Sequence, residues 1–169
     1  MIAAVVLAAG ASTRYGRPKQ RELLPAVLDA LAQSAAVDDV VVVAGAHSLD
    51  LETRVGARLV HATEWENGPG ASLRCGLAAL GDSVSHALVV LADGPTLDPR
   101  AIARVIEQRD RGDVVAATYD GTRSHPVALA RTMWANVPDD GGRAFDPVLV
   151  DCSDLQPPGD VDYPTTTTT

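Results

Sequence analysis

The sequence predicts an α/β protein of three layers, in which helices cover both faces of a mostly parallel sheet. Apolar, Val-rich segments alternate along the chain with segments of helical spacing, and this alternation is typical of βαβ units. The apolar segments are nearly continuous, as strands covered on both faces are. A chain of 169 residues has the length of one domain with a full hydrophobic core.

Four segments are predicted as strands, at residues 2–8, 40–44, 86–92 and 113–119. Three segments between them have helical spacing, at residues 23–36, 71–80 and 99–112. Asp98 is placed to cap the third helix, and Pro99 suits its first turn. We expect one domain over residues 1–164, followed by a low-complexity threonine tail at 165–169. Ligands of such folds bind at the carboxyl ends of strands, so the loops after the first strand and after strand 86–92 should form the site.

Composition and charge exclude several classes of partner. The formal net charge is −8, and both nucleic acid and anionic membranes repel such a protein, so we expect neither as a partner. The apolar start MIAAVVLAAG is too short to span a bilayer and lacks the basic region of a signal peptide. Cys75 and Cys152 have no paired spacing, which favours reduced thiols. These features predict a cytoplasmic protein.

A cluster of cations follows the first strand of this acidic chain, at Arg14, Arg17, Lys19 and Arg21. Lys19 is the only lysine. The preceding loop, residues 10–16, has small residues and hydroxyl donors that suit a phosphate, although it is neither a P-loop nor G-x-G-x-x-G. The missing G-x-G-x-x-G argues against a dinucleotide-dependent dehydrogenase. We expect a small phosphorylated ligand there; the alternative is a surface loop whose arginines face solvent.

Four stretches carry a family resemblance: LAAGASTRYGRPK at 7–19, GPGASLRCGL at 68–77, LVVLADGPTLDP at 88–99 and SHPVAL at 124–129. Two weaker ones are DDGGRA at 139–144 and DVDYP at 160–164. In this order they resemble the motifs of nucleotidyltransferases with a glycosyltransferase-A-like fold, and within these the MobA/MocA-like group of molybdenum-cofactor enzymes. The resemblance implies the Rossmann-like fold of nucleotide-diphospho-sugar transferases.

The resemblance also implies an activity. A nucleoside monophosphate, CMP first of all, would pass from CTP or GTP to a phosphorylated acceptor such as molybdopterin, with release of pyrophosphate. Mg²⁺ is the implied cofactor, and a molybdoenzyme or its chaperone is an expected partner. Such a reaction depends mainly on positioning and on charge stabilisation, which fits a site made of cations and a carboxylate.

Site residues follow from the same motifs. The implied catalytic residues are Arg14, Lys19 and Asp93. The implied nucleotide-binding residues are these two cations together with Leu7, Ala8, Ala9, Gly10, Ser12, Ser72 and Arg74. The acceptor would contact His125, Asp140 and Arg143. Asp93 would bind the metal, with Asp162 as a second carboxylate.

Several alternatives stay open. The segment after Lys19 is shorter than in the family and Ser124 replaces a glycine, so a catalytically silent nucleotide-binding or accessory protein is a second hypothesis. PKQ at 18–20 resembles methylerythritol-phosphate cytidylyltransferase, although that family's D-A-A-R-P is absent. As structural alternatives, Asp93 is a turn residue, Ser72 caps its helix and His125 ends a strand. Trp65 is interpreted as a loop anchor rather than a stacking platform.

Overall fold

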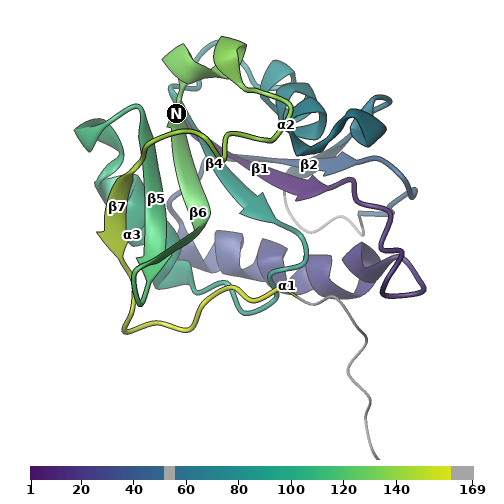
Figure 1. Ribbon diagram of the computed structural model, residues 1–169, viewed down its shortest axis with the longest axis horizontal. Helices are drawn as coiled ribbons and strands as arrows, with labels where there is room; N and C mark the ends of the chain where they lie inside the picture. The colour runs from purple at the N-terminus through teal and green to yellow at the C-terminus, as the bar shows by residue number, and fades with distance from the viewer. Residues whose placement is uncertain (52–55, 161–169) are drawn as a thin grey trace, which may run out of the picture.

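The computed structural model describes residues 1–51 and 56–160. Within these residues, seven strands form one sheet in the order β3-β2-β1-β4-β6-β5-β7 (Figure 1). Only β6 among the described strands runs antiparallel to its neighbours, so the mostly parallel sheet is confirmed. The strands are β1 (Ile2–Ala8), β2 (Asp39–Ala44), β3 (Ala57–His61), β4 (His86–Leu91), β5 (Val114–Tyr119), β6 (Thr122–Ala130) and β7 (Val148–Asp151).

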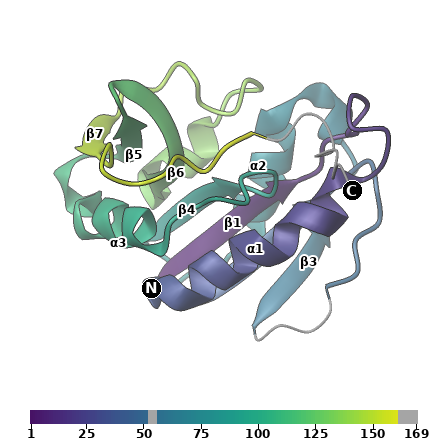
Figure 2. The ribbon, with the colours of Figure 1, turned by 90° about the horizontal axis from the view of Figure 1, so that it is seen from below.

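Helices cover both faces of this sheet. Helices α1 (Lys19–Ser34) and α3 (Pro99–Glu107) lie side by side on one face, and α2 (Pro69–Ala78) covers the other (Figure 2). The core is divided accordingly: alternate residues of β1 face opposite ways, with Val6 packed toward α1 and α3 and Val5 toward α2. Three short 3₁₀ helices complete the described elements: η1 (Trp65–Asn67), η2 (Arg109–Arg111) and η3 (Arg131–Asn136). The three-layer architecture is therefore confirmed.

Helix boundaries differ from the prediction at three places. Helix α1 begins at Lys19 instead of residue 23, so Lys19 lies in a helical turn rather than in the loop. Helix α2 begins at Pro69 with Gly68 as its N-cap, so the prediction that Ser72 caps this helix is wrong. Helix α3 is capped as predicted, because Asp98 Oδ1 accepts a hydrogen bond of 2.8 Å from the Arg100 amide. It ends at Glu107, and η2 follows as a separate turn.

Three strands were not predicted. β3 lies at one edge of the sheet and is largely exposed, so its sequence, ARLVH, has no continuous apolar run. β6, TRSHPVALA, carries polar residues and a proline in its first half, and β7 has only four residues at the other edge. Each of these strands is defined by pairing with another strand more than by its own pattern.

Two features bring the site loops together. β1 and β4 are parallel neighbours, with Leu7 paired to Leu91, so the loops that follow them leave the same edge of the sheet. Helix α2 lies close to the sheet because Gly76 has no side chain; a Cβ there would lie 2.5 Å from Val5 Cγ1. Residues 1–51 and 56–160 contain no helix long and apolar enough to span a membrane.

Candidate active site

The loop after β1 is held by the side chain of Gln20, which lies in the first turn of α1. This residue is only 4% exposed. Its Nε2 donates to the Gly10 carbonyl at 2.9 Å, and its Oε1 accepts from the Ser12 hydroxyl at 2.8 Å. Ser12 has a positive φ of 54°, and its carbonyl accepts from the Tyr15 and Gly16 amides. Gln20 thus fixes the backbone of the predicted phosphate loop, and sequence reasoning did not assign it a role.

The four cations after β1 do not all line the cleft. Arg17 pairs with Glu22, which also accepts from the Tyr15 hydroxyl at 2.8 Å. Arg21 donates to the Ser48 carbonyl at 3.0 Å. Arg14 and Lys19 alone among these four cations line the cleft next to the loop. The structure therefore places two of these four cations where a ligand in the cleft can reach them.

Lys19 and Asp93 form an ion pair across the carboxyl ends of β1 and β4. The Lys19 Nζ lies 2.9 Å from Asp93 Oδ2 and 3.7 Å from Asp160 Oδ1. The side chains of Lys19 and Asp93 are only 11% and 22% exposed. The pair is thus largely withdrawn from water and faces the cleft, where its charges are screened less than at the surface.

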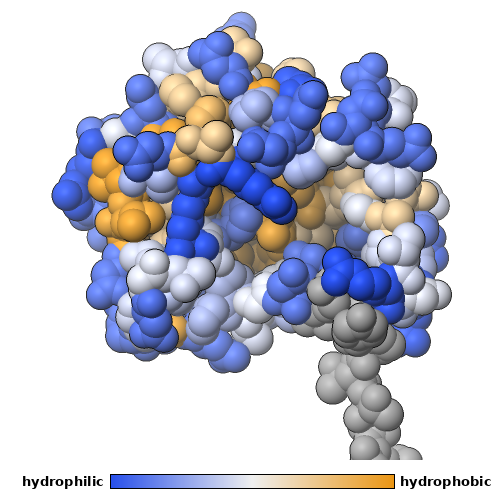
Figure 3. Space-filling view, viewed as in Figure 1, coloured by the Kyte–Doolittle hydropathy of each residue, from blue (hydrophilic) through white to orange (hydrophobic). Residues whose placement is uncertain are grey.

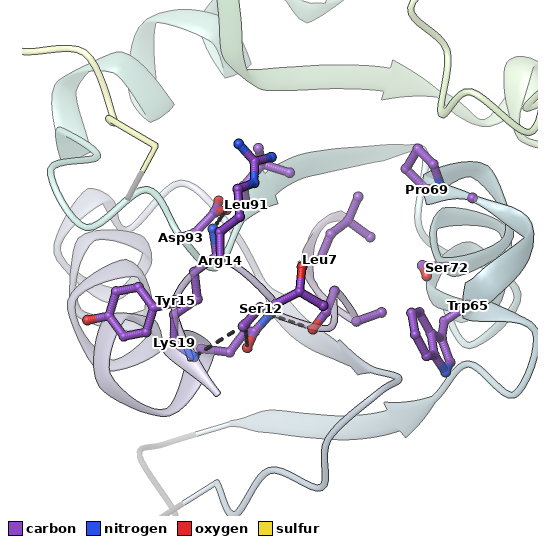
Figure 4. A pocket seen from close by; sticks show the side chains of 15 residues that line it. Leu7, Ser12, Arg14, Tyr15, Lys19, Trp65, Pro69, Ser72, Leu91 and Asp93 are labelled. Atoms are coloured by element: carbon purple, nitrogen blue, oxygen red, sulfur yellow. Dashed lines mark hydrogen bonds and ion pairs between the residues drawn. The ribbon is translucent and has the colours of Figure 1, made fainter. Parts of the chain in front are cut away.

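The cleft has a volume of about 420 Å³ and two ends of different chemistry (Figure 4). Asp93, Arg14 and Lys19 lie at one end, and Trp65 and Ser72 at the other. The surface is hollowed here, with hydrophobic residues on the floor and hydrophilic residues around it (Figure 3). Predicted nucleotide-binding residues that line the cleft are Leu7, Ala9, Gly10, Ser12, Arg14, Lys19 and Ser72.

Two predicted nucleotide-binding residues do not line the cleft. Ala8 is buried in the core between the sheet and α1. Arg74 points to the segment after η3, where its guanidinium donates to the Val137 carbonyl and to Asp139 Oδ1, both at 2.8 Å. Arg74 therefore links α2 to that segment by two hydrogen bonds.

A second cavity of about 300 Å³ contains two of the predicted acceptor residues, His125 and Arg143. Its walls are mainly apolar, from Leu73, Val89, Val127, Leu129 and Phe145. The third predicted acceptor residue, Asp140, shapes the adjacent turn, since its Oδ1 accepts from the Gly142 amide at 2.9 Å. It is not among the residues that line this cavity.

Arg123 on β6 holds the turn that carries Arg143. Its guanidinium donates to the carbonyls of Phe145, Gly142 and Arg143 at 2.8, 3.3 and 3.4 Å. Sequence reasoning did not single out Arg123, because the carbonyls that it contacts belong to a segment about 20 residues away along the chain.

His125 is neutral at physiological pH. Desolvation by the surrounding protein lowers the pKa of its imidazole to about 4, and the nearby Arg123 lowers it further, whereas Asp93 opposes the shift. The ring is half-buried between the second cavity and a smaller one next to Asp160. A neutral imidazole offers one donor and one acceptor, which suits contact with a substrate.

The described residues contain no group of three or more His, Cys, Asp or Glu side chains that could hold a metal ion. Asp93 nevertheless fits a Mg²⁺ site, because this metal is commonly held by one or two carboxylates together with water and substrate phosphates. Asp162, the predicted second ligand, lies outside the described residues. Asp160 belongs to the same DVDYP stretch, and its carboxylate lies next to Lys19.

Comparison with known families agrees with this geometry. The family model for the MobA-like NTP transferase domain matches residues 4–144. The chain belongs to this family. MobA-like NTP transferases are nucleotidyltransferases, so the family resemblance of the sequence motifs is confirmed.

Individual relatives agree with that assignment. Bifunctional protein GlmU of Sorangium cellulosum (strain So ce56) is 34% identical over 151 residues, which cover 78% of this MobA-like chain and 31% of GlmU. The chain therefore spans about a third of that relative's length.

Solved structures share the fold over nearly the whole chain. Rv0371c from Mycobacterium tuberculosis H37Rv superposes with a TM-score of 0.73 and 29% identity, covering 96% of this chain and 93% of that one. A complex of Rv0371c with manganese superposes with a TM-score of 0.69 and 22% identity, covering 89% of this chain and 87% of that one. The 4-diphosphocytidyl-2C-methyl-D-erythritol synthase from Anaerococcus prevotii DSM 20548 superposes with a TM-score of 0.69 and 18% identity, covering 92% of this chain and 91% of that one. At this identity the likeness shows a shared fold alone.

Proposed function

We propose that this MobA-like protein transfers a nucleoside monophosphate, CMP first of all, from an NTP to a phosphorylated acceptor of the molybdopterin type, and releases pyrophosphate. This proposal rests on the ion pair of Lys19 with Asp93 at one end of a cleft that is also lined by residues of the loop 10–16. Family membership supports nucleotidyl transfer. CTP rather than GTP is favoured only by LAAG at residues 7–10, which resembles the cytidylyltransferase branch.

The charged residues of the cleft and the loop after β1 have separate roles in this proposal. Arg14 and Lys19 bind the triphosphate and stabilise the charge that develops on the leaving pyrophosphate. The loop held by Gln20 offers backbone amides to the phosphates, while the Ser12 hydroxyl fixes the loop by donating to Gln20 Oε1. Asp93 would hold Mg²⁺, which when bound supplies charge neutralisation at the phosphates.

The acceptor is proposed to lie in the second cavity, against His125 and Arg143. Its phosphate is already ionised at neutral pH, so the chain does not need a general base; His125 instead orients the acceptor as a neutral hydrogen-bonding group. The apolar walls suit a flat ring system better than a polyol, because hydroxyl groups buried there would lack partners. This favours a molybdopterin-type acceptor over methylerythritol phosphate.

Pyrophosphate release tests the proposal. The protein is incubated with Mg²⁺ and each of CTP and GTP, with molybdopterin or methylerythritol 4-phosphate as acceptor, and Asp93→Asn is the inactive comparison. Release that depends on molybdopterin supports the proposal. Pyrophosphate release only with methylerythritol 4-phosphate would make that compound the acceptor. Tight NTP binding without pyrophosphate release in the presence of either acceptor would favour the catalytically silent alternative.

A further inference from the structure

The end of the cleft away from Lys19 and Asp93 has its own chemistry. It is built by η1 and the first turn of α2, which supply Trp65, Gly68, Pro69 and Ser72. None of these four residues carries a charge, and Trp65 presents a large aromatic surface (Figure 4). The cleft thus runs from a charged end to an aromatic end.

Trp65 faces the cleft while its other contacts anchor it. Its ring is half-buried and packs against the core on the α2 face. Gly45 at the end of β2 permits this position, since a Cβ there would lie 2.8 Å from Trp65 Cβ. The indole N–H makes no hydrogen bond with the described residues, in contrast to Trp134, whose Nε1 donates to the Leu129 carbonyl at 3.2 Å.

Ser72 is a second and independent indication of a ligand at this end. The residue is only 4% exposed and lines the cleft. Its hydroxyl makes no hydrogen bond with any residue that the structure describes. Among the described residues, Thr118 Oγ1 is the only fully buried polar side-chain atom without a partner, so the Ser72 oxygen is still reached from the cleft. It is therefore open to a hydrogen bond with a ligand atom.

We propose that Trp65 is the stacking platform for the nucleobase of the NTP, beside Ser72, which the family motif already implies in nucleotide binding and whose hydroxyl can bond the same base. This inference rests on the proposed function. If the phosphates lie against Arg14 and Lys19, the base extends along the cleft toward the uncharged end. Aromatic stacking is available to every base, so Trp65 supplies affinity, whereas Ser72 can select by donor and acceptor pattern.

The competing explanation is that Trp65 only anchors η1, as first interpreted from the sequence. The two explanations differ in what they predict for ligands without a base. Loss of a structural anchor would disturb the whole cleft and weaken the binding of nucleotides and of inorganic tripolyphosphate alike. Loss of a stacking platform would weaken the binding of nucleotides alone.

The test uses the full chain and the two tryptophans as matched probes. Trp134→Phe leaves Trp65 as the only tryptophan, and its fluorescence is titrated with Mg-CTP, Mg-GTP and Mg-tripolyphosphate. Calorimetry then compares wild type with Trp65→Leu, Trp65→Phe and Trp134→Phe, after thermal unfolding has established that each variant is folded.

We expect nucleotides to change the fluorescence of Trp65 and tripolyphosphate to leave it nearly unchanged. Trp65→Leu should weaken nucleotide binding roughly 5- to 150-fold, the range for loss of one aromatic base contact. Trp65→Phe should lose less, and Trp134→Phe should bind as wild type does. Tripolyphosphate affinity should stay the same in all variants.

Two results overturn the inference while the proposed function stands: undiminished nucleotide affinity in Trp65→Leu, or equal losses for nucleotides and tripolyphosphate. If wild type binds none of the nucleotides, the proposed function fails and the inference fails with it.

Discussion

The Lys19 ammonium lies 2.9 Å from the Asp93 carboxylate and joins the start of α1 to the loop after β4. Both side chains are largely withdrawn from water, yet both line the cleft. A phosphate that enters the cleft competes with Asp93 for Lys19, and a metal ion competes with Lys19 for Asp93. The proposed binding of phosphate and of a metal ion in the cleft therefore depends on this pair.

A double-mutant cycle measures the pair directly. Lys19→Met leaves the Asp93 carboxylate without its nearest cation and should lower the free energy of unfolding by about 1–3 kcal/mol, less than for a fully buried pair because water reaches the cleft. Adding Asp93→Asn should restore part of that loss, with a coupling energy of about 1–2 kcal/mol. Urea denaturation checks both values, and strictly additive effects would contradict the pairing.

Gln20 is expected to hold the phosphate loop. Gln20→Ala removes the partners of the Gly10 carbonyl and the Ser12 hydroxyl and should destabilise the protein by about 1–3 kcal/mol. Nucleotide affinity should fall with it, because the loop loses its fixed shape. Gln33→Ala on the exposed face of α1 is the matched control and should change stability by less than about 0.5 kcal/mol. Equal effects of the two substitutions would show that Gln20 has no special role.

Gly70 tests how closely the segment after η3 approaches α2. Helix propensity alone predicts that Gly70→Ala stabilises α2 by up to about 1 kcal/mol. A Cβ at Gly70 would instead clash with the Pro138 carbonyl, so we expect a loss of about 2–4 kcal/mol in thermal or urea unfolding.

Gly81→Ala is the control for that substitution. No atom lies within 4 Å of a Cβ built at Gly81, so its effect should stay within about 0.5 kcal/mol. A stabilised Gly70→Ala protein would mean that the segment does not lie against α2 as described.

His125 should make stability depend on pH in the metal-free protein. Its pKa is about 4 in the folded state and about 6.5 in an unfolded chain. Between these values the unfolded state binds more protons, so the free energy of unfolding falls as the pH drops from 6.5 to 4. His125→Gln removes this term.

Wild type should therefore lose about 2 kcal/mol more than His125→Gln over that interval, allowing for the partial exposure of the ring. Urea unfolding at several pH values checks the difference. Parallel curves for the two proteins would contradict the depressed pKa.

Local patterns predicted the parts of the fold that depend on local sequence. Continuous apolar runs predicted β1 with its observed bounds, and the Asp98-Pro99 pair predicted the start of α3. β6 was not predicted from its own pattern, because its polar first half is a strand through pairing with β5 across the turn at Asp120 and Gly121, and only its apolar second half pairs with β4. α1 begins earlier than predicted because Lys19 and Gln20 are held at its start by Asp93, Ser12 and Gly10.

The candidate site was predicted to a similar extent. The motifs placed Lys19 and Asp93 at the same edge of the sheet, and the structure brings them into contact. Gln20 lies in the PKQ stretch and Asp160 in the DVDYP stretch, both of which were identified as family motifs. The sequence therefore pointed to these two residues, although no role was predicted for either. Arg123 carried no such signal, since its role depends on three carbonyls of a distant turn. The catalytic and binding roles of all these residues stay predictions.

The cleft is proposed to bind an NTP with a divalent metal at Asp93. We would measure the melting temperature of wild type, Asp93→Asn and the exposed control Asp82→Asn with CTP, GTP, ATP and UTP, each with and without Mg²⁺. A ligand at about 100 times its Kd stabilises the native state by about 2.7 kcal/mol, or roughly 5–10 °C for a chain of this size. We expect a Mg²⁺-dependent shift, largest for CTP, that Asp82→Asn keeps and Asp93→Asn loses. Folded wild-type protein that no nucleotide stabilises, or an undiminished shift in Asp93→Asn, would overturn the proposed site.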